Sequence, residues 1–156
     1  MEKINSWKSL ETPCFILDAS ELERGVRAYQ SALGSNFEKY AVGYSVKTNS
    51  TPCVMEIVRN MGALAEIVSY DEYELVRLCG YDQKHIVYNG PLKSKNTFLD
   101  AIQNGAIVNI ETKREFEWLR ELSADKEYNV GLRLNINISK VFSEDEACAN
   151  DNSRFG

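Results

Sequence analysis

The chain has 156 residues, of which 44% are hydrophobic and 26% are charged, a composition typical of about one soluble globular domain. Its net charge of −5 and pI near 5.0 argue against a nucleic-acid partner, because an acidic surface repels phosphate. No apolar leader opens the sequence and no stretch approaches the ~20 apolar residues of a membrane span, so we expect a cytoplasmic protein without a membrane partner.

The first 36 residues are predicted to form one strand and one helix. Residues 14–18 are mostly apolar and typical of a short strand. Ser20 and Glu23 have the spacing of a capping box, in which two side chains satisfy each other's backbone donors at the start of a helix. Four apolar residues then recur at helical spacing: Leu22, Val26, Tyr29 and Leu33.

Beyond residue 40, β-rich runs alternate with amphipathic helical stretches, which indicates a parallel α/β architecture. The predicted strands are residues 41–46, 63–68, 85–88, 106–110 and 130–135. The helices between them have their own start signals, namely Pro52 after Thr51, a helix from about residue 94, and two further capping boxes, Ser69 with Glu72 and Thr112 with Glu115. The pattern gives four strand–helix units and a fifth strand.

A full (β/α)8 barrel typically needs ~250 residues, so residues 37–136 are expected to be the N-terminal portion of a longer TIM barrel. A closed five-stranded flavodoxin-like sheet is the alternative, and the spacing of the elements does not separate the two. Residues 137–156 are polar and are expected to form a loop and the start of a truncated next segment.

Lys47 follows the first predicted barrel strand. Alternate residues of a barrel strand face the axis, so Lys47 points inward together with Gly43 and Ser45 if it belongs to that strand. Barrel enzymes build their sites at the carboxyl ends of the strands, and an amine placed there can attack an aldehyde. On spacing alone, a solvated lysine at a strand end is the favoured interpretation.

Residues 44–49, Tyr-Ser-Val-Lys-Thr-Asn, resemble the Tyr-Ala-Val-Lys-Ala-Asn signature of the fold type III decarboxylases that depend on pyridoxal 5'-phosphate. That group includes diaminopimelate, ornithine and arginine decarboxylases, and the likeness is closest to diaminopimelate decarboxylase. Further runs resemble the family's motifs in the same order, at residues 65–72, 88–93, 131–135 and 153–156. The resemblance implies an alanine-racemase-like barrel in which Lys47 binds pyridoxal 5'-phosphate as a Schiff base.

The resemblance also implies the organisation and activity of the parent protein. Residues 1–36 would join the barrel to a second, β-rich domain, and residues 37–136 would be a partial cofactor-binding barrel. The parent would be a homodimer that decarboxylates a basic or diamino acid, such as diaminopimelate to give lysine, in lysine or polyamine biosynthesis. This chain would then be a fragment with an incomplete site. An amino-acid racemase, a cofactor-carrier barrel and a non-catalytic, partner-binding relative are the alternatives.

The resemblance assigns further residues to the site. Glu66, Glu72 and Arg133 would bind the cofactor together with Lys47, and the two carboxylates or the cofactor would be the anionic partners of Arg133. Residues expected to contact the substrate or support the site are Ser45, Asn49, Ser69 and Asn89. Glu72 has a purely structural role available in its capping box, and Asn89 and the nearby Lys93 stand in a run that is also ordinary turn chemistry.

The cysteines and the single histidine give little support for a metal site. Cys14, Cys53, Cys79 and Cys148 lie far apart with no Cys-x-x-Cys pair, which is typical of reduced thiols. Zinc sites typically need clustered cysteine or histidine ligands, and His85 is the only histidine. We therefore expect no metal ion.

Overall fold

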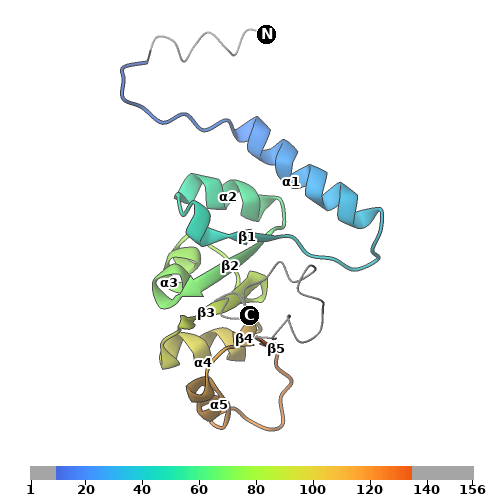
Figure 1. Ribbon diagram of the computed structural model, residues 1–156, viewed down its shortest axis with the longest axis vertical. Helices are drawn as coiled ribbons and strands as arrows, with labels where there is room; N and C mark the ends of the chain where they lie inside the picture. The colour runs from blue at the N-terminus through green and yellow to red at the C-terminus, as the bar shows by residue number, and fades with distance from the viewer. Residues whose placement is uncertain (1–9, 135–156) are drawn as a thin grey trace, which may run out of the picture.

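Five parallel strands form one sheet in the computed structural model, which describes residues 10–134 (Figure 1). The strands are β1 (Gly43–Ser45), β2 (Leu64–Ser69), β3 (Ile86–Leu92), β4 (Ile107–Ile110) and β5 (Val130–Leu132). Their order in the sheet is β1-β2-β3-β4-β5, and each pair is parallel. A flavodoxin-like sheet has the order 2-1-3-4-5, so the consecutive order excludes that alternative and agrees with the predicted barrel.

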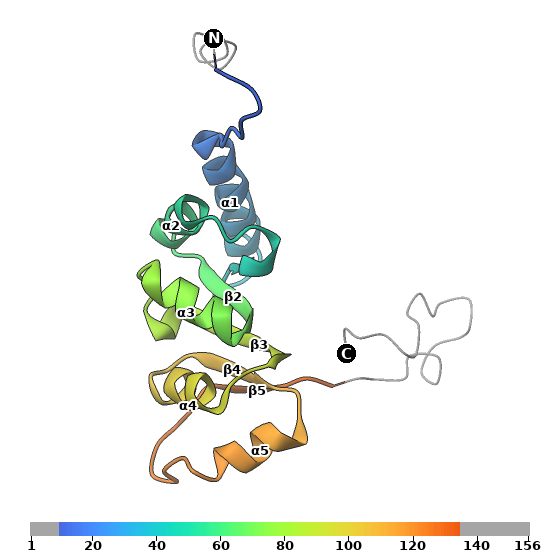
Figure 2. The same cartoon turned by 90° about the vertical axis from the view of Figure 1, so that its left-hand side faces the viewer.

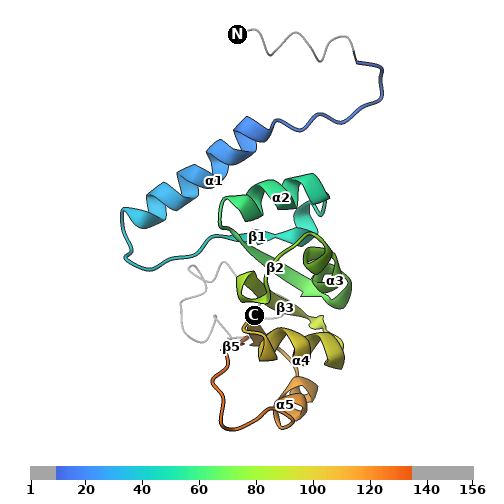
Figure 3. The same ribbon diagram turned by 180° about the vertical axis from the view of Figure 1, so that it is seen from behind.

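Helices connect the strands and cover one face of the sheet. They are α1 (Ala19–Gly34), α2 (Pro52–Asn60), α3 (Tyr70–Leu78), α4 (Lys95–Gln103) and α5 (Lys113–Leu119), with short 3-10 turns η2 (Val46–Thr48) and η3 (Gln83–His85). Figure 2 shows α2, α3 and α4 on the same side of the strands. Seen from behind in Figure 3, α1 lies beyond α2 and away from the centre of the sheet.

The strand alternation separates an apolar face from a polar one. Residues that face the helices are fully or almost fully buried and make up the core: Ala65, Ile67, Ile86, Tyr88, Val108 and Ile110. The alternate positions on the other face carry the half-buried polar residues Glu66, Asn89 and Asn109. In a barrel the face away from the helices is the interior, so these polar side chains are placed where a barrel site would be.

The predicted leading strand at residues 14–18 is wrong. The segment is exposed and contains no strand, because no described strand lies beside it to pair with its backbone groups. The helix is present, but it begins differently from the prediction. Asp18 is the N-cap, with its Oδ1 accepting hydrogen bonds from the amides of Ser20 (3.0 Å) and Glu21 (3.1 Å), so Ser20 lies inside the first turn instead of capping it.

The other helix starts follow the predictions more closely. Thr112 and Glu115 form the complete capping box. Ser69 caps α3 by accepting from the amide of Glu72 at 3.2 Å, but the Glu72 carboxylate accepts from the amide of Val68, at 2.8 Å. Half of the predicted capping box is therefore formed, and in the other half the donor to Glu72 is the amide of Val68 in place of that of Ser69.

Candidate active site

A hollow of about 510 Å³ lies at the carboxyl ends of the strands. Its polar lining comes from Lys47, Glu66, Asn89, Asn109, Glu111 and Arg133. These residues belong to all five strands or to the residues that directly follow them. Parallel strands bring their carboxyl ends to one edge, which is why residues so far apart in sequence meet there.

Lys47 stands on the 3-10 turn that follows β1. The strand ends at Ser45, which is the last residue of β1 to pair with β2. Val46, the first residue of the turn, is fully buried. Thr48 Oγ1 donates to the carbonyl of Ser45 at 2.6 Å and closes the turn. The lysine side chain is exposed and lines the hollow, and within residues 10–134 it forms no hydrogen bond or ion pair. It therefore lies at the predicted face, but on a turn instead of within the strand.

A row of hydrogen-bonded side chains crosses the first four strands on the polar face. Ser45 donates to Glu66 Oε2 at 2.5 Å, and Asn89 Nδ2 donates to Glu66 Oε1 at 2.7 Å. Asn109 Nδ2 in turn donates to Asn89 Oδ1. Because the carboxylate of Glu66 only accepts, it determines the orientation of both asparagine amides.

Gly131 leaves space for the end of this row. A Cβ atom at residue 131 would lie 1.8 Å from Asn109 Oδ1, which is far inside the contact distance of any two atoms. Gly131 pairs with Asn109 across β4 and β5. A side chain at residue 131 would therefore displace the Asn109 amide from the hollow.

Arg133 reaches the hollow from the residue after β5. Its Nη1 lies 3.0 Å from Glu111 Oε2, and its side chain is 32% exposed against 7% for Glu111. The predicted partners were Glu66 and Glu72 or the cofactor, whereas the described contacts pair it with Glu111, a residue not singled out from the sequence. Glu111 follows β4 directly, and Arg133 follows β5. The Arg133 amide donates to the carbonyl of Ile110 at 3.0 Å, which places the two side chains next to each other.

A fully buried ion pair lies behind Glu111. Lys93 Nζ is 3.2 Å from Glu115 Oε1, and both side chains have no exposed surface. Burial lowers the pKa of Lys93 from its ordinary value, while the negative charges of Glu115 and Glu111 act in the opposite direction. The sequence indicated Lys93 only as a residue after β3, and Glu115 only as a helix cap.

Four predicted site residues lie elsewhere than on the lining of this hollow, namely Ser45, Asn49, Ser69 and Glu72. Ser45 supports the site from behind, through its hydrogen bond to Glu66. Glu72 and Ser69 are engaged at the start of α3, as described above. Asn49 accepts from the amide of Thr51 at 3.1 Å through its Oδ1, and its carbonyl accepts from the Tyr44 hydroxyl at 2.7 Å. Asn49 thus shapes the connection into α2 in this structure, and the hollow brings together Lys47, Glu66, Asn89 and Arg133 of the predicted set.

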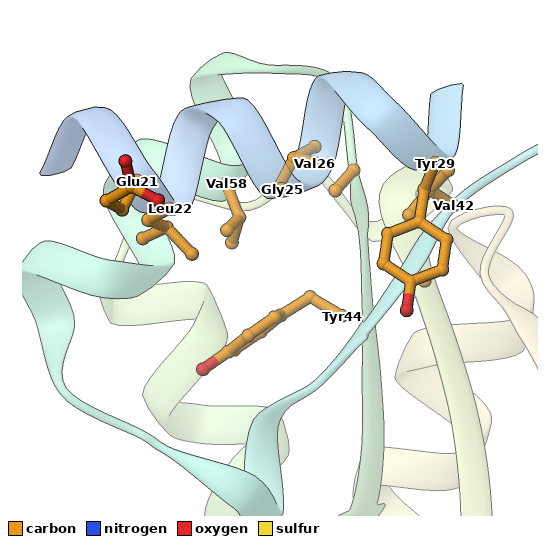
Figure 4. Close-up of a pocket in the computed structure, with 10 residues that line it drawn as sticks. Glu21, Leu22, Gly25, Val26, Tyr29, Val42, Tyr44 and Val58 are labelled. Carbon is orange, nitrogen blue, oxygen red and sulfur yellow. The ribbon is translucent and has the colours of Figure 1, made fainter. Parts of the chain in front are cut away.

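A second hollow, of about 500 Å³, lies between α1, α2 and β1 and is lined mostly by apolar side chains (Figure 4). Leu22 and Val26 of α1 line it together with Val58 of α2 and Tyr44 of β1. It lacks the cluster of charged and amide groups that distinguishes the first hollow. We therefore assign chemistry to the hollow at the strand ends.

Within residues 10–134, no group of three or more histidine, cysteine, aspartate or glutamate residues is arranged to hold a metal ion. None of the helices in that range is long and apolar enough to cross a membrane. Cys14, Cys53 and Cys79 are free thiols, and Cys148 lies outside the described residues, as do the predicted end of the fifth strand at residue 135 and the polar segment 137–156.

Residues 19–156 match the family model described as "Pyridoxal-dependent decarboxylase, pyridoxal binding domain". The chain belongs to this family. The match confirms the family inferred from residues 44–49 and with it the cofactor, pyridoxal 5'-phosphate, which is the group that the family's binding domain holds.

Similar proteins include curated members of this decarboxylase family. A probable chloroplastic diaminopimelate decarboxylase of Oryza sativa subsp. japonica is 29% identical over 147 residues, covering 93% of this chain and 30% of that protein. Diaminopimelate decarboxylase of Aquifex aeolicus is 26% identical over 148 residues, covering 93% and 34%. The chain thus spans about a third of the length of the curated relatives that it matches.

The fold of a solved relative agrees with the sheet described above. The crystal structure of diaminopimelate decarboxylase from Helicobacter pylori complexed with L-lysine superimposes with a TM-score of 0.69 at 21% identity, covering 84% of this chain and 34% of that one. This likeness supports the fold, and the consecutive parallel strands of this chain correspond to part of a TIM barrel.

Proposed function

We propose that this chain forms part of the active site of a pyridoxal 5'-phosphate-dependent decarboxylase, in which Lys47 holds the cofactor through its amine. The observation that carries the proposal is the exposed Lys47 side chain, which has no polar partner among residues 10–134, on the wall of a polar hollow at the carboxyl end of β1. Relatives named diaminopimelate decarboxylase support a diamino acid of the diaminopimelate type as the substrate and lysine as the product.

The residues around Lys47 fit such a cofactor. An amine without a competing ion pair within residues 10–134 is available to react with an aldehyde. When bound, pyridoxal 5'-phosphate supplies an electron sink for the electrons left by the departing carboxylate. Glu66, held by Ser45 and Asn89, provides a fixed negative charge in the same hollow, and Arg133 provides a positive one beside Glu111.

The phosphate of the cofactor has no dedicated cradle among the residues assigned to this hollow. In TIM barrels a phosphate site is frequently built after strands 7–8, and the described residues provide five strands. We therefore propose that residues 10–134 supply the lysine and the polar wall, and that they alone bind the cofactor weakly.

The whole protein's assembly and location are also proposals. We infer a homodimer and a cytoplasmic location from the resemblance to this decarboxylase family. The plant relative is named as chloroplastic, so location would vary among relatives. A role in polyamine synthesis is a less favoured proposal than lysine synthesis, since the sequence matches cited above are to diaminopimelate decarboxylases.

The test is to identify the lysine that captures the cofactor. The chain is mixed with pyridoxal 5'-phosphate, reduced with borohydride and mapped by mass spectrometry of its peptides. We expect the adduct on Lys47 and its loss in Lys47→Ala, while Lys126→Ala, which removes another exposed lysine, leaves the yield unchanged. Label distributed evenly over the exposed lysines, or retained at full yield in Lys47→Ala, would contradict the proposal.

A further inference from the structure

The buried pair of Lys93 and Glu115 is not needed to hold a cofactor on Lys47, and stability alone does not explain it. Removing two charges from water is expensive, and replacing such a pair with apolar side chains is often neutral or stabilising. The Lys93 and Glu115 side chains nevertheless have no exposed surface. What the pair contacts indicates what it does.

The ammonium of Lys93 joins the ends of two strands. It donates to the carbonyl of Gly90, a residue of β3, and to Glu115 Oε1 at 3.2 Å. It also lies 4.0 Å from Glu111 Oε1, at the end of β4. The backbone of Gly90 is itself confined, since a Cβ there would lie 2.2 Å from the carbonyl oxygen of Val68. Lys93 thus makes two hydrogen bonds and lies close to a second carboxylate, so one cation links the ends of β3 and β4.

Glu115 transmits this arrangement to the backbone of Glu111. Its Oε2 accepts from the amides of Glu111 at 2.7 Å and Thr112 at 3.1 Å. The carboxylate of Glu111 is fixed separately, since its Oε1 accepts from the amide of Gly90. The main chain of Glu111 is therefore held by Glu115 and its side chain by Gly90, and Lys93 is hydrogen-bonded to both of these residues.

Glu111 in turn holds Arg133. Its Oε2 lies 3.0 Å from Arg133 Nη1, and this is the point at which the buried network reaches the hollow. The four side chains carry two positive and two negative charges, so the network is neutral as a whole. Its exposure rises along the path, from 0% for Lys93 and Glu115 to 7% for Glu111 and 32% for Arg133.

We propose that Lys93 and Glu115 are positioning residues that fix Glu111 and, through it, the guanidinium of Arg133 on the wall of the hollow. The inference rests on the proposed function only in treating that hollow as the site. The path of contacts from Lys93 to Arg133 stands on the geometry described above.

The test measures how accessible the Arg133 guanidinium is, without any cofactor. The chain is treated with phenylglyoxal, which reacts with guanidinium groups, and labelling of each arginine is followed by mass spectrometry. Glu111→Gln removes the negative charge of the described partner of Arg133, and Lys93→Met removes the buried cation. A double variant, Lys93→Met with Glu115→Gln, replaces the pair with neutral side chains of similar size. Labelling is compared under conditions in which circular dichroism shows each variant to be folded.

The controls are an ion pair and an arginine outside the network. Lys95→Met removes a lysine two residues away that pairs with Glu121 at 2.7 Å, with both side chains about half exposed. Arg77, whose Nη1 donates to the carbonyl of Tyr81 at 2.7 Å, serves as the internal reference. Its labelling would rise if a variant loosened the whole fold.

We expect Arg133 to react roughly tenfold faster in Glu111→Gln and in both Lys93 variants, the effect of losing about one charge-assisted hydrogen bond. Arg77 and the Lys95→Met variant should stay at the rate of the unmodified sequence. An unchanged Arg133 rate in the folded double variant would overturn the proposal, as would an unchanged rate in Glu111→Gln. If Lys93→Met does not fold, the Arg133 labelling rate of the neutral double variant tests the proposal in its place. A failure of Lys47 to capture the cofactor would leave this result standing, because no cofactor is used.

Discussion

Asn89 Nδ2 donates a hydrogen bond of 2.7 Å to Glu66 Oε1, which joins the polar faces of β2 and β3. The bond has a direction, because a carboxylate accepts and cannot donate. It turns Asn89 Oδ1 toward Asn109, whose own amide nitrogen donates to it. The charge of Glu66 therefore orders the side chains across the interior face of the sheet.

Replacing Glu66 with glutamine tests this ordering. Glu66→Gln removes the charge, and the Ser45 hydroxyl can rotate to accept from the new amide nitrogen while Asn89 still donates to the amide oxygen. We expect a loss of about 1 kcal/mol in the free energy of unfolding, because two charge-assisted hydrogen bonds become neutral ones, which are roughly half as strong. Urea unfolding followed by circular dichroism measures it, with Glu56→Gln on the exposed surface of α2 as the control. Equal stability of the two variants would contradict the role given to Glu66.

Gly131→Ala should disturb the other end of the same row. The new methyl group would overlap Asn109 Oδ1, 1.8 Å away, and overpacking of this kind typically destabilises by about 1–3 kcal/mol. The double variant Gly131→Ala with Asn109→Ala removes the overlapping atom, so we expect it to be more stable than Gly131→Ala alone. Gly25→Ala is the control, because a Cβ there meets nothing within 4 Å and helix propensity favours alanine. Additive effects of the two substitutions would be evidence against the overlap.

Much of the architecture was predictable because its determinants are local. Capping pairs such as Thr112 with Glu115, and Pro52 after Thr51, act within one turn of helix. The prediction of a leading strand was wrong because a strand depends on distant parts of the chain. An apolar run such as residues 14–18 becomes a strand only beside a partner, and a partner is a tertiary feature.

The site residues were predictable where they lie at the carboxyl end of a predicted strand. Lys47, Glu66, Asn89 and Arg133 were found from their places in the predicted strands and from the family motifs. Asn109 and Glu111 were missed, although both stand at the end of a predicted strand, at residues 106–110, and that position was the available signal. The pairing of Lys93 with Glu115 spans 22 residues and two connections, and only the packing of α4, α5 and the strands brings the two together.

The conformation of Gly90 separates backbone strain from steric overlap. Gly90 has φ +79 and a Cβ there would lie 2.2 Å from Val68 O, whereas Gly62 has φ +80 with nothing within 4 Å. Gly62→Ala should therefore show the strain alone, about 1–2 kcal/mol. Gly90→Ala should lose clearly more, because backbone atoms cannot move aside easily. Thermal unfolding of both variants measures the difference, and similar losses would mean that β2 and β3 can separate at this point without penalty.

Alkaline pH should unfold the chain through its buried tyrosines. Burial raises the pKa of Tyr81 and of Tyr88 to about 12, and burial together with the bond to Asp100 raises the pKa of Tyr73 as well. A group whose pKa is raised by folding contributes stability that is present below its unfolded pKa of about 10 and is lost as the pH rises toward the folded value. We therefore expect stability to fall between pH 10 and about 12.

The buried lysine acts in the opposite sense and does not obscure this decline. The pKa of Lys93 is lowered by burial, so its contribution to stability increases with pH and is complete above the unfolded lysine value of about 10.4. A loss of stability above that pH is therefore caused by ionisation of the buried tyrosines. Tyrosinate absorbance and circular dichroism, recorded together, should show the buried tyrosines titrating as the helices melt. Tyr88→Phe should reduce the amplitude of that step. A single titration of every tyrosine in the folded chain would contradict the raised pKa values, because it would mean that water reaches the phenols of Tyr81 and Tyr88 in the native state.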